Sequence, residues 1–433
     1  MKTTALTTST LFLTLSATGL LSGCGDDGAP ATGSASDTDT GADTDTTGTA
    51  PTTGPTTTPM NDESTGPGPT TTDPDSETDT DTASGCSVRP GEWSAPDWDA
   101  HVVAEMALRN QLADLAGGSG IMRNAENGTV QLTGVSDLTD AFVGDLAAAT
   151  HPGFTAAIDS SFQEFYDAVS AGPNELMTDG MWDPGPNGGI WGDSNRGIDE
   201  GGIENRQIVD KGLFGAGAFY HHALLLTEGD LDDETFDKIA YIWGNNAALV
   251  PDDPDAPLVT SANYSYRQGF HAAMAEQLIA AKAYAQDAEC TAERDAAVVE
   301  FFRLWETSMM SRVVYYINQM AVRLAVAETR DNFAEALHQL AEGLGLAAGF
   351  HGLPDPRSGP LAGAGRLVTD QEVEDILDAL GFDMNDQGSS TTGTFVESLP
   401  AFETAQGASE AVIRDTYGVD QATIATWRTP TAG

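Results

Sequence analysis

Positive charge is scarce in this chain of 433 residues. Lysine and arginine together number 19 against 66 aspartates and glutamates, which gives a formal net charge of -47. Such a surface repels the phosphates of nucleic acids and of anionic lipid headgroups. We therefore expect no nucleic-acid partner. The charge favours metal cations or basic ligands, although general acidity is also a common means of staying soluble.

The segment 25–85 has no aromatic residue, no lysine and no arginine. It consists almost entirely of Thr, Asp, Gly, Pro, Ser and Ala, with Asp-Thr-Asp-Thr repeats at 37–40 and 79–82. Its alternating acids lack the glycine and the closing glutamate of an EF-hand calcium loop. Such a segment cannot bury enough apolar surface to offset the entropy lost on ordering. We expect residues 24–85 to form a disordered acidic stalk.

The start of the chain lacks an apolar run long enough for a good membrane-spanning helix. The apolar stretch at 11–21 is short, contains Thr and Ser, and follows an early cation, Lys2. A charged start, a short apolar segment and small residues before a cleavage point are typical of an export signal. The stretch ends in Leu-Ser-Gly-Cys at 21–24, which resembles the lipobox of bacterial lipoproteins.

The lipobox resemblance implies that residues 1–23 are a signal peptide and that Cys24 becomes the lipidated first residue of the mature protein. The protein is then exported and tethered to a membrane through its lipid, with everything else in water. Gly25 follows the cysteine in place of an aspartate. By resemblance to enterobacterial sorting, this favours the outer membrane and leaves open which side the protein faces.

Cysteine is rare, with only Cys24, Cys86 and Cys290 in the chain. If the first carries lipid, the other two form an even pair in an exported protein, where disulfides persist. We expect Cys86 to bond Cys290. This disulfide would pin the start of the folded region to the N-terminal end of a long helix.

Strand-type alternation is nearly absent from residues 86–433, and only 129–132 reads as a short strand or extended piece. Apolar residues elsewhere recur every three or four positions, which is typical of helices. The longest predicted helix begins after Thr291 and runs toward Glu328, a rod of about 50 Å. Further helices are predicted at 98–115, 137–149, 154–170, 208–226, 234–243, 266–286, 332–346 and 371–380, the last with Thr369 and Glu372 spaced as a capping box. The fold class is all-α, as one large domain or two lobes.

Three segments rich in Gly and Pro interrupt the predicted helices, at 171–205, 250–262 and 352–367. Loops of this length inside a folded domain are either functional or disordered. The first contains Trp182 and Trp191, which indicates a packed loop. It is either a lid or an insertion anchored by its aromatic residues.

Several segments resemble the imelysin-like lipoproteins, in particular the branch catalogued as a domain of unknown function. They are Trp-Glu at 305–306 followed by Tyr-Tyr-Ile-Asn at 315–318, Asp-Lys-Gly-Leu-Phe-Gly-Ala at 210–216, and Ala-Leu-His-Gln-Leu-Ala-Glu-Gly-Leu-Gly at 336–345. The resemblance spans roughly residues 90–425. It implies a two-lobed helical bundle in an exported, lipid-anchored protein. Members of the family are associated with iron uptake, and some were first described as peptidases.

The Gly-x-His-x-x-Glu signature of the imelysin family is incomplete in this chain. Its nearest match begins Gly269-Phe270-His271, but Met274 stands where the motif has glutamate, and the next acid is Glu276. This departure argues against the family's metal site at this position and against peptidase activity.

Two His-Glu pairs have the spacing of neighbours on a helix. His338 and Glu342 are four residues apart, with Glu335 three before the histidine, and His101 and Glu105 form the second pair. Side chains at these spacings share one helix face. If the two helices face each other, these five residues can bind a divalent cation such as zinc or iron. The alternative is that each pair is hydrogen bonded and structural.

Four further residues are candidates for a pocket between lobes: Trp305, Tyr316 and Asn318 on the long helix, and His271. The alternative is that they are core residues with satisfied polar groups. His221 and His222 are adjacent on a predicted helix and point apart, so we expect one to be buried and the other exposed.

Other signatures of catalysis are missing from the sequence. It has no Gly-x-Ser-x-Gly elbow, no Gly-x-x-x-x-Gly-Lys phosphate loop and no His-Glu-x-x-His pair. The first hypothesis is therefore a non-enzymatic, lipid-anchored binding protein for a metal ion or small ligand, and the family resemblance implies a link to iron. The alternatives are a metal-dependent peptidase of the imelysin type and a structural or adhesion module displayed on the stalk.

Overall fold

The computed structural model describes most of the chain beyond the stalk. The predictions for Cys24, the signal segment and the stalk lie outside the described residues, and so do parts of the three Gly- and Pro-rich loops. No helix among the described residues is long and apolar enough to cross a membrane. The described residues are 85–174, 177–178, 181–182, 185–252, 260–327, 329–354, 366–383 and 399–430.

Helices dominate the described residues, which confirms the all-α fold class. The N-terminal helices are α1 (Trp98–His101), α2 (Val103–Ala116), α3 (Ile121–Glu126), α4 (Ser136–Phe142), α5 (Asp145–Ala149) and α6 (Pro152–Ala171). The central ones are α7 (Asn205–Gly212), the π-helix η1 (Leu213–Tyr220), α8 (His221–Leu226), α9 (Asp233–Trp243), α10 (Ser261–Arg267) and α11 (His271–Tyr284). The remainder are the 3-10 turn η2 (Ala288–Cys290), α12 (Thr291–Leu324), α13 (Arg330–Ala348), α14 (Asp370–Ala379), α16 (Leu399–Tyr417) and α17 (Gln421–Arg428).

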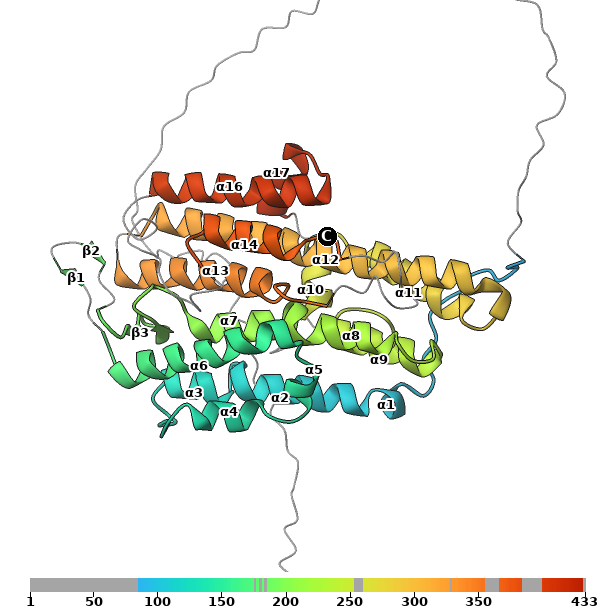
Figure 1. Ribbon diagram of the computed structural model, residues 1–433, viewed down its shortest axis with the longest axis horizontal. Helices are drawn as coiled ribbons and strands as arrows, with labels where there is room; N and C mark the ends of the chain where they lie inside the picture. Colours follow the sequence, from blue (N-terminus) through green and yellow to red (C-terminus); the bar gives the residue numbers. More distant parts are fainter. Residues whose placement is uncertain are drawn as a thin grey trace, which may run out of the picture. The chain divides into compact units, whose positions relative to one another are not determined.

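The long helix α12 is the spine of the bundle, as the apolar spacing predicts. It packs beside α13, with α11 along its N-terminal half and α17 near its C-terminal half (Figure 1). On the far side of α13 from α12, α7 and then α6 form the next layers, and α14 with α16 covers the opposite side. The described residues from Gly85 onward form one compact unit by their contacts rather than two separate ones.

The structure contains the disulfide that the cysteine count predicts. Cys86 and Cys290 are bonded, with their Cα atoms 4.6 Å apart and 204 positions apart in sequence. Cys290 is fully buried and directly precedes α12. The bond therefore fixes the start of the folded unit to the N-terminal end of its longest helix.

Glycines allow α13 to lie very close to α7 and η1. A Cβ at Gly345 would lie 2.6 Å from the carbonyl oxygen of Gln207, and one at Gly349 would lie 2.7 Å from that of Gly212. A Cβ at Gly212 would in turn overlap the ring of Phe154 on α6. Larger residues at these positions would force the helices apart, which explains the glycines in both segments.

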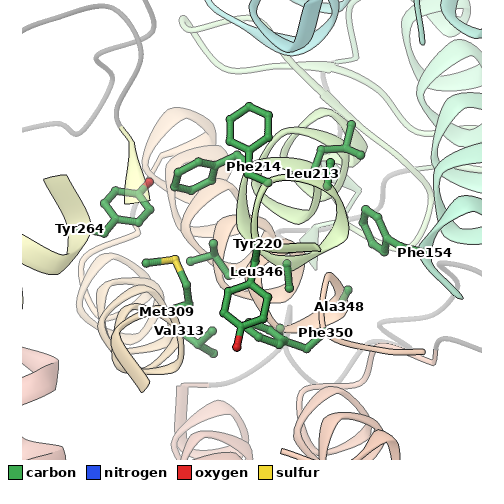
Figure 2. Close-up of a cluster of buried hydrophobic side chains, with 14 of the residues drawn as sticks. Phe154, Leu213, Phe214, Tyr220, Tyr264, Met309, Val313, Leu346, Ala348 and Phe350 are labelled. Carbon is green, nitrogen blue, oxygen red and sulfur yellow. The ribbon is translucent and has the colours of Figure 1, made fainter. Parts of the chain in front are cut away.

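The π-helical segment η1 lies in the middle of this core. Its helical path is broken at Gly215, where ψ is -118°, and all its residues are buried. Figure 2 shows side chains of η1 and of its neighbours. The ring centres of Phe214 and Tyr264 are 5.2 Å apart and those of Tyr220 and Phe350 are 5.6 Å apart, both in edge-on contact. Departures from α-helical winding of this kind often occur at functional sites.

The predicted helices agree with the structure better in position than in length. The predicted helix 137–149 is two helices separated at Gly144, where φ is +112°, and 266–286 is interrupted at Gly269, where φ is +81°. The capping box of Thr369 and Glu372 is confirmed. Three helices were not predicted: α3, α16 and α17.

Of the two alternatives for 129–132, the strand was wrong. These residues are bend and irregular chain after α3, where Thr129 and Val130 donate their amides to the Asn124 carbonyl. The strands lie instead in the 171–205 loop. They form two antiparallel pairs: β1 (Met177–Thr178) with β2 (Met181–Trp182), and β3 (Gly189–Trp191) with β4 (Arg196–Ile198). Trp191 is buried against Phe333, so this part of the loop is packed.

Candidate functional site: a buried charge network

The first predicted pair, His101 and Glu105, lies among α1, α2, α8 and α9. His101 Nδ1 is 2.7 Å from Asp237 Oδ2, whose other oxygen accepts a 2.6 Å hydrogen bond from Lys282. Glu105 Oε1 is 3.2 Å from His222 Nε2. Each member of the pair is therefore engaged with a different partner.

The second set, on α13, faces Arg196 on β4 instead. The Arg196 guanidinium donates to both carboxylate oxygens of Glu335, at 2.9 and 3.0 Å, and its Nη1 lies 2.8 Å from His338 Nδ1. Arg196 is 1% exposed. A buried cation thus occupies the position where a metal ion would have to bind.

The predicted five-residue metal site is therefore wrong. Among the described residues, no group of three or more His, Cys, Asp or Glu side chains is arranged to hold a metal ion. The physical reason is the packing order of the helices. Helices α1 and α2 pack on α9, and α2 also contacts α7, whereas α13 packs on α7 and α12, so the two His-Glu pairs lie apart.

Glu204, directly before α7, is the centre of the interactions around His338. Its Oε2 lies 2.8 Å from His338 Nδ1 and 3.5 Å from Arg196 Nη1, and its Oε1 accepts a 3.0 Å bond from Arg206. Burial opposes ionisation of Glu204. The neighbouring His338, Arg196 and Arg206 outweigh burial and hold its pKa well below the usual range.

From Glu204 the contacts continue to α3. Arg206 Nε is 2.9 Å from Glu126 Oε2, which also accepts a 3.0 Å bond from Arg123. The other Glu126 oxygen accepts the amide of Gly197, next to Arg196 on β4. Burial raises the pKa of Glu126, because the nearby cations only partly offset the loss of solvent.

In the other direction the contacts reach α7. His338 Nε2 is 3.6 Å from Glu342 Oε2, and the other Glu342 oxygen is 3.3 Å from Lys211 Nζ. We call the whole set the buried charge network. It joins α3, β4, α7 and α13 through Arg123, Glu126, Arg196, Glu204, Arg206, Lys211, Glu335, His338 and Glu342.

Opposite charges balance within this network. It contains four carboxylates and four arginine or lysine cations, so its acids are paired with cations of the chain itself. A buried network of this kind is costly to break and fixes the relative positions of the elements it joins. The network therefore has a structural role, which is the alternative given above for each His-Glu pair.

A cluster of aromatic rings encloses Arg312 on α12, beyond Lys211. The guanidinium carbon lies 4.6, 3.8 and 4.4 Å from the ring centres of Tyr264, Tyr315 and Tyr316. The hydroxyls of Tyr264 and Tyr316 are 2.6 Å apart. Stacking on several aromatic faces is a favourable environment for a desolvated guanidinium.

The other predicted pocket residues are core residues in separate places. Trp305 is fully buried and packs edge-on against Tyr220 at 5.3 Å. Asn318 donates to the carbonyl of Arg428, and His271 bonds Asn245 at 2.7 Å. None of the three lines the clefts described below, and these contacts favour the core alternative.

The residues that hold the charge network together were missed by sequence reasoning. Arg196 and Glu204 lie in the 171–205 loop, which the sequence presents as an insertion between helices. Their positions in the sequence have no helical or strand periodicity to indicate burial. The one available signal was the packed character of the loop, indicated by Trp191.

Open space lies elsewhere, on the face formed by α11 and the start of α12. A cleft of about 690 Å³ there is lined by both helices and by residues 90–91. Two other clefts, of about 250 and 470 Å³, lie beside Trp93 and beside Trp427.

Comparisons with known proteins add no relative. No protein-family model, no curated protein and no solved structure matches this chain. The site is therefore interpreted from its own geometry.

Proposed function

We propose that this protein is a lipid-anchored cell-envelope protein whose helical domain binds a small ligand and does not catalyse a reaction. The observation that carries the anchoring is the sequence Leu-Ser-Gly-Cys at 21–24, at the end of a segment with the composition of an export signal. The acidic stalk then separates the anchor from the folded unit. The resemblance to the imelysin-like lipoproteins supports an exported, lipid-anchored protein, and Gly25 after the cysteine favours the outer membrane.

Two features support binding over catalysis. The five predicted metal ligands are engaged with other side chains: Glu335 with Arg196, Glu342 with Lys211, His338 with Glu204, His101 with Asp237 and Glu105 with His222. The described part of the chain also offers a cleft of about 690 Å³, within the usual range for small-ligand sites. The alternative of a metal-dependent peptidase requires a metal-ligating set, and the described residues contain none.

The anchor is tested by Cys24→Ser. Without the cysteine no lipid can be attached, and the protein should leave the membrane fraction or remain unprocessed. Membrane fractionation with carbonate extraction, together with labelling by a radioactive fatty acid, measures both effects.

The matched control is the double variant Cys86→Ser/Cys290→Ser, which removes two cysteines and keeps Cys24. It should remain in the membrane fraction and take up the label. Membrane association of Cys24→Ser after carbonate extraction would contradict the proposal.

A further inference from the structure

The largest of the three clefts lies where the N-terminal segment crosses α11 and the first turns of α12. The disulfide between Cys86 and Cys290 holds this segment in place a few residues away. The hollow exists because alanines face it from both helices, among them Ala275, Ala280 and Ala297. Its apolar lining is completed by Ile279 and Tyr284.

The charged side chains that line this cleft are all acidic. Glu276 on α11 and Glu293 on α12 line it, and no lysine, arginine or histidine is among the lining residues. The two acids come from different helices, so an ion placed between them would contact both elements. An anionic ligand is excluded by this arrangement, because nothing in the lining would neutralise it.

Glu293 provides an independent indication of a ligand. Its Oε2 is buried and accepts no hydrogen bond from any described residue. A covered carboxylate oxygen without a donor is unfavourable, and a charge-assisted hydrogen bond from a ligand would relieve that cost. Glu293 as a whole is half-buried, and among the described acids the buried Glu105 also has one oxygen without a donor, whereas Glu204 and Glu306 have donors on both oxygens.

We infer that this cleft binds a small organic cation with an aliphatic body, its ammonium or guanidinium group on Glu293 and Glu276 and its apolar part on the alanine-lined wall. This inference deepens the proposed binding function and rests on it. The chain's own stalk cannot supply the cation, because residues 25–85 contain no lysine or arginine. A metal ion does not fit, because two carboxylates on an apolar wall offer too few ligands.

Three probes of equal length separate charge from apolar binding: n-octylammonium, n-octanol and n-octanoate. Each is titrated calorimetrically into the chain from residue 25 onward, produced in an oxidising compartment so that the disulfide forms. High salt is used because it screens the general attraction of an acidic protein for cations. We expect n-octylammonium to bind about tenfold more tightly than n-octanol, and n-octanoate not to bind.

Glu293→Gln should weaken n-octylammonium binding by about tenfold and leave n-octanol binding unchanged. The matched control is Glu300→Gln, on the same helix but in an exposed ion pair with Arg303, which removes the same charge outside the cleft. It should bind as the wild type does. Equal loss in both variants would overturn the inference, because it would show only a general charge effect.

Ala275→Phe should abolish binding of all apolar probes by filling the cleft. If that variant unfolds, Ala272→Phe on the exposed rim replaces it. If n-octanol or n-octanoate binds as tightly as n-octylammonium and this binding is lost in the filled variant, the ligand is not a cation. That result would overturn the ligand class and leave the binding function standing. Absence of binding by all three probes would overturn the cleft as a site, while fractionation of Cys24→Ser tests the anchor separately.

Discussion

Removal of the Arg196 guanidinium should destabilise the folded unit strongly. Arg196→Met keeps a long apolar side chain but removes the two hydrogen bonds to Glu335 and the contacts to His338 and Glu204. Glu204 is fully buried, so it would lose a cation without gaining water. Breaking a buried charge pair from one side costs about 3–5 kcal/mol of unfolding free energy. That is a large part of the roughly 5–15 kcal/mol typical of a folded domain.

The assay is urea denaturation, followed by far-ultraviolet circular dichroism and tryptophan fluorescence. The matched control is Arg303→Met on α12, where an exposed arginine pairs with Glu300. It makes the same chemical change and should alter the unfolding free energy by less than about 0.5 kcal/mol. If Arg196→Met is no more destabilising than Arg303→Met, the network does not hold these elements together and the reasoning fails.

Two further changes test the interior and the disulfide. Burial lowers the pKa of His151 to about 4, against about 6.5 in the unfolded chain. The unfolding free energy should therefore fall by about 3 kcal/mol as the pH is lowered from 6.5 to 4. His151→Gln should flatten this pH dependence in urea denaturation, and an unchanged pH dependence would contradict the assignment. The double variant Cys86→Ala/Cys290→Ala should lose about 2–5 kcal/mol, because the bond closes a loop across 204 positions. Equal stability of this variant and the wild type would show that the loop constraint contributes nothing.

The fold was predictable where apolar residues recur at helical spacing within a single element. The spine α12 and the helices α6, α9 and α13 have apolar residues every three or four positions, and that spacing depends on the helix alone. Helix α3 was missed because six residues are too few for a periodic pattern. The breaks at Gly144 and Gly269 depend on left-handed backbone angles, which a glycine permits but does not require.

The candidate site was harder to predict because it depends on which helix faces which. The spacing of His338 and Glu342 correctly places both on one face, where their side chains are 3.6 Å apart. Arg196, the partner of His338, comes from a loop more than a hundred residues earlier, and no local rule connects the two. The same limit applies to Glu293, whose missing donor can be recognised only in three dimensions.

Intact-mass analysis of the protein extracted from membranes tests the central claim, an exported and lipid-anchored module, most directly. We predict a mature chain that begins at Cys24, carries the added mass of lipid on that residue, and has Cys86 and Cys290 joined in a disulfide. A chain that retains residues 1–23, or one that begins elsewhere without lipid, would contradict the account.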